Sequence, residues 1–438
     1  MQRSVFEIIG PVMVGPSSSH TAGMARIGAE AARHFPGGYK KLDLCFSRRL
    51  EKTYKGHRSH IAAAGGAIGL SPDSPELKNS LLLAAEKKID VSVSFFEEGE
   101  VPQNTLRVTF FYGDGTLHSL TAQSVGGGSI EILKIDGAET DEAPFLDYGA
   151  TVSGFSGIKS ITELLDKKET FTEIAVRYEE RRSGRNRAEI ISRMRDELSV
   201  MEESVKKGLD RNELLYGLTS GEDAKRLLES NAVKHNYYNK AAAYAIAVME
   251  QNASMGRLVA APTGGSAGIV PGVLFALKEE YGFSDEKLAD ALFTAALFGI
   301  MADERGVSFS GSVGGCQGEI GVSAAIASAA AAALFTDNKK IIANAFAMTL
   351  KNLLGLVCDP IAGPIEVPCI KRNAMGAVTA LVMCDMALAG IESFIPADEV
   401  MDALKDVEER MPPELKCACV GGLACTKTAC EFRSRETQ

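Results

Sequence analysis

Three cysteines in the second half of the chain lie in glycine- or proline-bearing segments between apolar helical stretches. Cys316 follows two glycines, Cys358 precedes an Asp-Pro pair, and Cys369 follows a proline. Backbone N–H groups at helix ends lower the pKa of a nearby thiol and favour the thiolate that binds metals. The spacings contain no Cys-x-x-Cys zinc knuckle. The three cysteines are therefore either metal ligands or buried side chains in tight turns.

The remaining cysteines divide between the C-terminal tail and the predicted core. Thiols as crowded as those of the tail can bind zinc or a cluster by themselves, although their spacing matches no ferredoxin. Two others fall in a strand pattern and a helix pattern and are predicted to be core residues. The tail cysteines are Cys417, Cys419, Cys425 and Cys430, and the predicted core cysteines are Cys45 and Cys384.

A hydroxyl-rich segment, Ser17-Ser18-Ser19-His20-Thr21, stands just before a helical stretch. Free backbone N–H groups at a helix N-terminus, together with hydroxyls, form a ready site for a small anion. A helix N-cap accounts for one of these hydroxyls but not for four hydroxyls and a histidine in five positions. The segment therefore predicts a binding site for an anionic group such as a carboxylate.

His57 and His60 also lie at the start of a helical stretch, after Lys55-Gly56. A histidine with its ordinary pKa near 6.5 is suited to act as a general base at neutral pH. Two histidines three positions apart on a helix can also bind a metal, and a solvated helix start gives the same pattern. The pattern alone therefore leaves these three interpretations open.

Two glycine clusters could let a backbone approach a ligand closely. Thr263-Gly264-Gly265-Ser266 adds two hydroxyls and precedes an apolar helix, so we expect it to bind phosphate or carboxylate. It is not a phosphate-binding Walker loop, because no Gly-Lys-Ser/Thr follows. The other cluster, residues 124–128, lies between strand patterns and is predicted to be a turn.

Strand and helix patterns alternate in the first 150 residues, which predicts an α+β domain. Residues 151–170 contain Gly154, Ser156 and a charged run and are predicted to be a linker. From residue 171 onward strand signals nearly vanish, so 171–438 is predicted to be all-helical. The strand patterns lie at 41–46, 91–95, 106–112 and 116–122, and the helical ones at 22–33, 59–68, 186–207, 241–251, 272–281, 285–301, 320–335, 339–354, 373–391 and 397–410.

The composition fits a soluble globular protein, with 45% hydrophobic and 24% charged residues. A net charge of -10 leaves no basic field for nucleic acid. The longest apolar stretch, 322–335, is shorter than the roughly 18 residues that cross a bilayer, and no signal peptide is readable. We therefore expect a cytoplasmic protein without a membrane partner, whose thiols are kept reduced.

Taken together and in this order, the motifs resemble those of the iron–sulfur-dependent L-serine dehydratases (L-serine deaminases) in their single-chain form. The resemblance implies a serine dehydratase beta-type domain over 1–150, like the allosteric substrate-binding domain of phosphoglycerate dehydrogenases. It also implies an all-helical catalytic domain, an oxygen-labile [4Fe–4S] cluster, homo-oligomers such as dimers, and a role in amino-acid catabolism and gluconeogenesis. The motifs are residues 15–21, 55–57, 124–128, 261–268 and 315–317, and Cys358-Asp359-Pro360 through Cys369.

The resemblance also implies a role for each candidate site residue. The cluster ligands would be Cys316, Cys358 and Cys369. The α-proton would be taken by His57, while His20 binds substrate or relays a proton. The substrate would be held by Ser17, Ser18, Ser19, Thr263, Gly264, Gly265 and Ser266. Two features depart from the family: His60 stands where an Asp is usual, and the tail carries four cysteines.

The implied activity is a lyase reaction that converts L-serine into pyruvate and ammonia by Lewis-acid elimination at the open iron. Two alternatives stay open, an L-cysteine desulfidase on a related fold and a non-catalytic sensor of amino acids or oxygen. A pyridoxal-phosphate dehydratase would need a Schiff-base lysine, and no lysine lies in a recognisable motif for one.

Overall fold

The computed structural model describes residues 2–35, 37–51, 53–97, 99, 101–140, 151, 157–158, 160–210, 212–232, 236–361 and 365–436. Its contacts divide the chain into two units. Val12–Asp147 and Met255–Arg257 form the first, which we call the sheet unit. Met1–Pro11, Tyr148–Ser254 and Leu258–Gln438 form the second, the helical unit. The first eleven residues thus fold with the helices.

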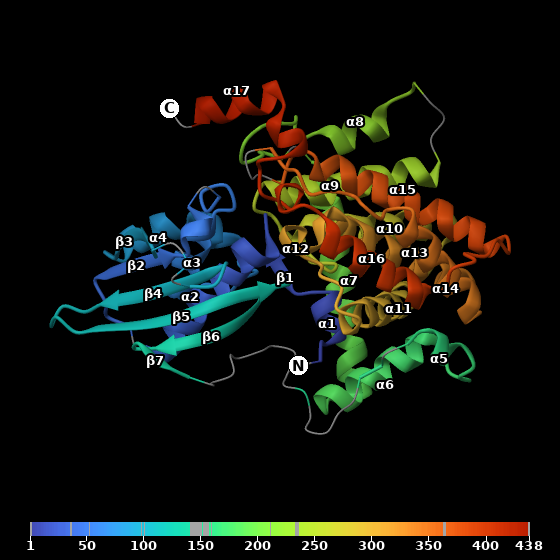
Figure 1. The fold of residues 1–438 in the computed structure, drawn as a ribbon, viewed down its shortest axis with the longest axis horizontal. Helices are drawn as coiled ribbons and strands as arrows, with labels where there is room; N and C mark the ends of the chain where they lie inside the picture. Colours follow the sequence, from blue (N-terminus) through green and yellow to red (C-terminus); the bar gives the residue numbers. More distant parts are fainter. Residues whose placement is uncertain are drawn as a thin grey trace. The chain divides into compact units, whose positions relative to one another are not determined.

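The sheet unit contains a six-stranded mixed sheet in the order β3-β2-β4-β5-β6-β7. β2 and β3 are parallel, and each other neighbouring pair is antiparallel. The strands are visible in Figure 1, together with the helices of the same unit. The strands of this sheet are β2 Lys41–Phe46, β3 Asp90–Phe95, β4 Thr105–Phe111, β5 Leu117–Gly126, β6 Ser129–Ile135 and β7 Ala138–Glu139. The unit also contains β1 Val12–Val14, which lies outside this sheet, and helices α2 Gly23–His34, α3 Ser59–Ala67 and α4 Ser80–Glu86.

Helices α2 and α3 pack closely on each other because glycines face backbone at their contact. A Cβ at Gly28 would lie 2.2 Å from the carbonyl oxygen of Ala63, and one at Gly66 only 1.9 Å from that of Ala25. Their apolar side chains join those of the sheet in one buried core. This packing fixes the start of α3, where the predicted histidine site lies.

The predicted strands and helices of this region are confirmed within one to four residues at their ends. Strands β1, β6 and β7 and helix α4 are not among the predicted elements. The glycine cluster at 124–128 is a turn only in part, because β5 continues to Gly126 and the chain turns at Gly127 and Gly128. The mixed sheet with helices confirms an α+β region.

The helical unit consists of fourteen α-helices within the described residues, and every helix predicted for this region is present. Of the predicted linker, residues 152–156 and 159 lie outside the described part of the chain, and α5 occupies part of the rest. The helices are α1 Val5–Ile8, α5 Thr162–Leu165, α6 Phe171–Ser183, α7 Arg187–Gly208, α8 Asp223–Glu229, α9 Tyr237–Ala253, α10 Ile269–Tyr281, α11 Asp285–Glu304, α12 Gly311–Cys316, α13 Val322–Phe335, α14 Lys339–Lys351, α15 Cys369–Leu388, α16 Ala397–Arg410 and α17 Lys427–Glu436. The short strand β8 (Arg257–Val259) follows α9.

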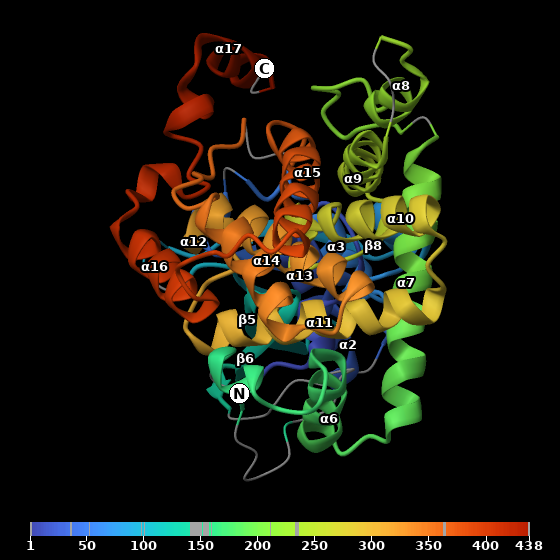
Figure 2. The same cartoon turned by 90° about the vertical axis from the view of Figure 1, so that its right-hand side faces the viewer.

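Helix α13 forms the centre of this unit, where α10, α11, α14 and α15 pack around it (Figure 2). Its alanines let the neighbouring helices approach closely, and nearly all its residues are buried. The longer helical run Gly311–Phe335 is apolar and long enough to cross a membrane, but 83% of its apolar window is buried inside the unit. This run is therefore a core helix of a globular unit.

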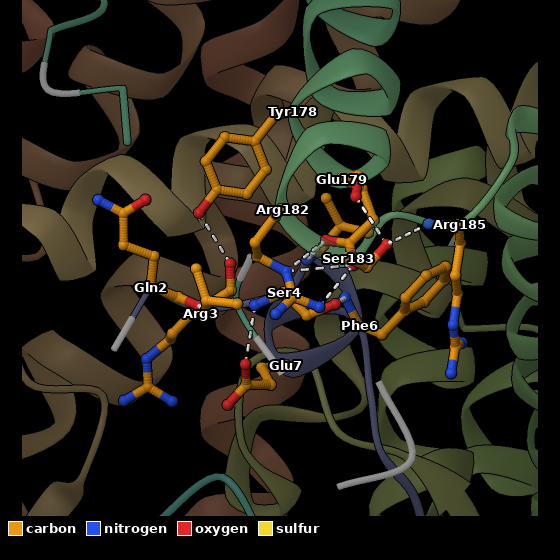
Figure 3. Close-up of polar contacts among 12 residues, drawn as sticks. Gln2, Arg3, Ser4, Phe6, Glu7, Tyr178, Glu179, Arg182, Ser183 and Arg185 are labelled. Atoms are coloured by element: carbon orange, nitrogen blue, oxygen red, sulfur yellow. Dashed lines mark hydrogen bonds and ion pairs between the residues drawn. The ribbon is translucent and has the colours of Figure 1, made fainter. Parts of the chain in front are cut away.

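A buried ion pair anchors the N-terminal segment to α6 (Figure 3). The guanidinium group of Arg182 donates to the carboxylate of Glu179 at 2.7 Å, and both side chains are almost fully buried. The same carboxylate accepts the backbone N–H of Val5 at 3.0 Å. Nearby, the Tyr178 hydroxyl donates to the carbonyl oxygen of Arg3 at 2.8 Å. These contacts join α6 to the segment that begins the chain.

We expect Arg182→Met to lower the free energy of unfolding by about 3–5 kcal/mol, because it leaves the Glu179 carboxylate buried without its charged partner. Urea unfolding followed by circular dichroism measures the change. Arg181→Met is the matched control, since Arg181 is the exposed neighbour in the same helix and should change stability by less than about 0.5 kcal/mol. Equal effects of the two variants would contradict the prediction.

Candidate functional site

The three predicted ligand cysteines lie in the helical unit, two of them at helix ends, and all three are buried. Cys316 ends α12, Cys369 begins α15, and Cys358 lies in the segment that follows α14. The sulfur atoms of Cys316 and Cys358 and a carboxylate oxygen of Glu319 all lie within 4.8 Å of one another. Among the described residues, this is the group of ligand side chains that is close enough to share a metal ion.

The thiols strongly affect one another's ionisation. Hydrogen bonds with the Cys316 and Cys417 thiols, and then burial, raise the pKa of Cys358 well above its ordinary value. Burial, followed by the charges of Cys316 and Glu319, raises the pKa of Cys369 in the same way. Neighbouring acidic groups in a buried site lose their protons only at high pH, unless a bound cation stabilises their negative charges. This arrangement is typical of a metal site.

Arg372 orders the thiol group from one side. Its guanidinium donates to the Cys316 sulfur at 3.4 Å, to the Val357 carbonyl oxygen at 2.8 Å and to the Asp359 carboxylate at 2.8 Å. It therefore brings positive charge to the Cys316 sulfur and fixes the turn that carries Cys358. The sequence analysis assigned no role to Arg372, although it lies one helical turn after Cys369.

Glu319 connects the thiol group to the predicted Thr263–Ser266 loop. The Thr263 hydroxyl donates to the Glu319 carboxylate at 2.6 Å and lies 3.1 Å from the Ser266 hydroxyl. A Cβ at Gly265 would lie 2.5 Å from the same carboxylate, so this close approach requires glycine. Gly264 precedes it in the same turn. The structure thus brings the loop beside the thiols.

Glu319 itself was not predicted as a site residue. Its place three residues after Cys316, about one helical turn, is the signal that could have identified it. Burial raises the pKa of its carboxyl group.

The donor set fits a metal centre that prefers soft ligands. Thiolates select zinc, copper(I) and iron–sulfur clusters over hard cations. A glycine lines the group as well: a Cβ at Gly311 would lie 2.9 Å from the Cys358 sulfur and 3.4 Å from Glu319. Two buried thiols, one carboxylate and a neighbour without a side chain therefore fit a site for a soft metal ion. Cys369 is buried and its ionisation is affected by Cys316 and Glu319, but it does not belong to the group of side chains close enough to share one ion.

The cysteines outside this group differ in their burial. Cys45 and Cys384 are buried core residues, as predicted. Cys417 lies beside Cys358, whereas Cys425 and Cys430 are exposed. No described group of tail cysteines is close enough to share a metal.

The sheet unit brings the two predicted histidines together. The rings of His20 and His57 stack with centroids 4.6 Å apart. The Thr21 hydroxyl donates to the His57 carbonyl oxygen at 2.7 Å, which ties the serine-rich segment to the start of α3. Ser17 caps the short π-helical turn Ser18–Ala22, where its hydroxyl accepts the His20 N–H at 3.1 Å. Ser18 is buried and Ser19 is partly buried in that turn.

The partners of the two rings fix their tautomers. Nδ1 of His57 lies 3.2 Å from the Thr53 carbonyl oxygen, which can only accept, so Nδ1 carries the proton and Nε2 the lone pair. Nε2 of His20 donates to Asn104 Oδ1 at 3.0 Å, which leaves its Nδ1 facing the Ser17 hydroxyl at 3.4 Å. His57 therefore presents the lone pair of Nε2.

Burial keeps these rings neutral. Burial and then the charge of His20 lower the pKa of His57 to about 3, and burial lowers that of His20. Burial and the charge of Arg58 lower the pKa of His60 to about 4. A neutral imidazole is the form that can accept a proton.

Acid should destabilise the folded chain through these histidines. The unfolded chain binds a proton at His57 below about pH 6.5, whereas the folded chain does not until about pH 3, so stability falls as the pH drops through this window. We expect His57→Asn to reduce the slope of the free energy of unfolding against pH in this window by up to about 1.4 kcal/mol per pH unit. Urea unfolding at several pH values measures it. The exposed His118, replaced by Asn, is the control, and an unchanged slope for His57→Asn would contradict the prediction.

Comparison with known proteins gives a consistent result. A profile of the family described as serine dehydratase alpha chain matches residues 166–424. The probable L-serine dehydratase alpha chain of Bacillus subtilis (strain 168) is 41% identical over 64% of this chain and 95% of its own. L-serine dehydratase 2 of Escherichia coli (strain K12) is 29% identical over 98% of this chain and 100% of its own. The L-serine dehydratase of Streptomyces coelicolor gives the same three values. The chain belongs to the serine dehydratase alpha chain family.

Proposed function

We propose that this protein is an L-serine dehydratase that converts L-serine into pyruvate and ammonia with a [4Fe–4S] cluster held by Cys316, Cys358 and Cys369. The observation that carries the proposal is the buried group of thiols beside Glu319, in a chain of this family. Full-length relatives that bear the name L-serine dehydratase support the substrate.

The reaction must remove a weakly acidic α-proton and expel hydroxide, which is a poor leaving group. When bound, a cluster with one iron free of protein ligands supplies a Lewis acid for the substrate's hydroxyl and carboxylate groups. The chain supplies the base: Nε2 of the neutral His57 takes the α-proton. Loss of water leaves an aminoacrylate, which tautomerises and hydrolyses to pyruvate and ammonia without further help.

The remaining site residues bind and orient the substrate. We assign the carboxylate to the hydroxyls of Ser17, Ser18 and Ser19 and to the loop that Thr263, Gly264, Gly265 and Ser266 form. The Thr263 hydroxyl donates its single proton to Glu319, so donation from this hydroxyl to the substrate would require that bond to be exchanged. His20, stacked on His57, binds substrate or relays the proton.

The proposal extends to the setting of the enzyme. We propose a cytoplasmic homodimer in amino-acid catabolism that feeds pyruvate into gluconeogenesis, with a sheet unit like the allosteric substrate-binding domain of phosphoglycerate dehydrogenases. Light scattering during size-exclusion chromatography measures the oligomeric state. A monomer at micromolar concentration would contradict the homodimer.

Anaerobic purification tests the central proposal. We expect iron and inorganic sulfide in equal amounts, a broad absorbance near 400 nm that air bleaches, and pyruvate release from L-serine. Oxygen-free protein without inorganic sulfide that still deaminates L-serine would overturn the cluster proposal. Sulfide release from L-cysteine without pyruvate from L-serine would identify a desulfidase, and amino-acid binding without turnover would identify a sensor.

A further inference from the structure

The C-terminal tail runs alongside the segment that carries Cys358. The backbone N–H of Cys358 donates to the Leu415 carbonyl oxygen at 2.8 Å, and the N–H of Cys417 donates to the Cys358 carbonyl oxygen at 2.6 Å. These two bonds form a parallel bridge between Cys358 and Lys416. The bridge pairs Cys358 with Lys416, so Cys417 is the residue next to the paired position and its backbone N–H bonds directly to Cys358.

Further contacts hold the tail in this position. The N–H of Leu423 donates to the Asp359 carboxylate at 2.9 Å, and a Cβ at Gly422 would lie 2.4 Å from that carboxylate. The Lys416 ammonium group donates to the Glu408 carbonyl oxygen at 2.7 Å. The tail therefore packs against the Cys358 turn at several points, and Cys417 is placed by them.

The two residues are joined by their backbones, because the N–H of Cys417 donates to the carbonyl oxygen of Cys358 at 2.6 Å. The Cys417 thiol is also among the groups that raise the pKa of the Cys358 thiol, which agrees with a close approach of the two side chains. Cys358 is 3% exposed, whereas Cys417 is partly exposed. A small oxidant in solution therefore reaches the Cys417 thiol before the Cys358 thiol.

We propose that Cys358 and Cys417 form a disulfide in the metal-free protein when a low-molecular-weight disulfide is present. The Cys417 thiolate attacks one sulfur of the small disulfide, which forms a mixed disulfide and releases one thiol. The Cys358 thiolate then attacks the Cys417 sulfur and releases the second thiol. Two protein thiols are oxidised and one small disulfide is reduced to two thiols, so atoms and electrons balance.

Cys417 rather than Cys316 is the proposed disulfide partner of Cys358, because an oxidant in solution can reach its sulfur. Cys316 is 1% exposed, and its sulfur accepts a hydrogen bond from Arg372. Although the Cys316 thiol also contacts Cys358, an oxidant in solution cannot reach either of these two buried sulfurs directly. Thiol–disulfide exchange depends on such access. The pair that reacts is therefore the one with a partly exposed member.

The disulfide removes Cys358 from the set of metal-binding thiols until a reductant restores it. This consequence depends on the proposed function, whereas the disulfide itself depends only on the geometry of the two thiols. A disulfide test on the metal-free chain therefore needs neither iron nor L-serine. Its failure is distinguishable from a failure of the proposed dehydratase activity.

The test uses the full-length chain, freed of metal under argon and then incubated with oxidised glutathione. After free thiols are alkylated, tryptic peptides are mapped by mass spectrometry without reduction. We expect the peptide 352–371 linked to the peptide 417–427, at a mass two hydrogens below the sum of the two. Fragmentation should place the bond between Cys358 and Cys417.

Matched variants identify the thiols. Cys417→Ser and Cys417→Ala should each lose the linked peptide, while Cys425→Ser, which removes the exposed thiol of the same tryptic peptide, should keep it. Circular dichroism checks that each variant is folded. A Cys316–Cys358 bond, a bond within the tail, or no bond in the wild-type chain would overturn the proposal.

Discussion

Replacing His57 with alanine should reduce deamination of L-serine by roughly 10²–10⁴-fold, the usual contribution of a general base. The lone pair of its Nε2 is available because Nδ1 donates to the Thr53 carbonyl oxygen. Burial keeps the ring neutral at physiological pH, so its lone pair is not already protonated. The iron and sulfide content should not change, because no ligand thiol is altered. Pyruvate release and metal analysis on the same anaerobic sample measure both quantities.

His118→Ala is the matched control for this prediction. His118 lies in β5 of the same sheet unit, where its half-exposed side chain pairs with Asp136. This variant should keep nearly wild-type activity. A His57→Ala enzyme as active as the wild type would remove His57 from the mechanism, and parallel loss of iron would show that His57 supports the fold rather than the chemistry.

The sequence predicted most helices because their signal is local. An apolar periodicity within ten to twenty residues determines a helix such as α7 or α16, and the structure confirms both. It also predicted the three buried thiols as a possible ligand set, from their places at helix ends. The structure confirms their burial and the closeness of Cys316 to Cys358.

What the sequence could not predict depends on contacts between distant segments. The bridge between Cys358 and Lys416 joins residues far apart in the chain, and no local pattern at Cys417 distinguishes it from Cys425. The stacking of His20 on His57 depends in the same way on the packing of α2 against α3. Glu319 is different, because its spacing from Cys316 was readable.

Replacing Cys358 with serine should remove nearly all iron, inorganic sulfide and absorbance near 400 nm. A hydroxyl does not ionise at neutral pH and is a poor replacement for a thiolate toward soft metals. Replacing a residue that only hydrogen-bonds to a metal ligand typically lowers metal affinity or activity by about 10–100-fold. Loss of a ligand itself should therefore lower activity by at least roughly 10²-fold. Metal analysis and visible spectra of anaerobically purified protein measure the effect.

The control for Cys358→Ser is Cys384→Ser, which makes the same change at a buried cysteine of α15 outside the thiol group. It should keep its iron and its colour, even if it lowers stability. This comparison separates the loss of a ligand from the general cost of burying a hydroxyl. Because Cys417 lies beside Cys358, one further outcome is informative: a Cys358→Ser protein that retains an intact cluster would show that tail thiols, rather than Cys358, hold the metal.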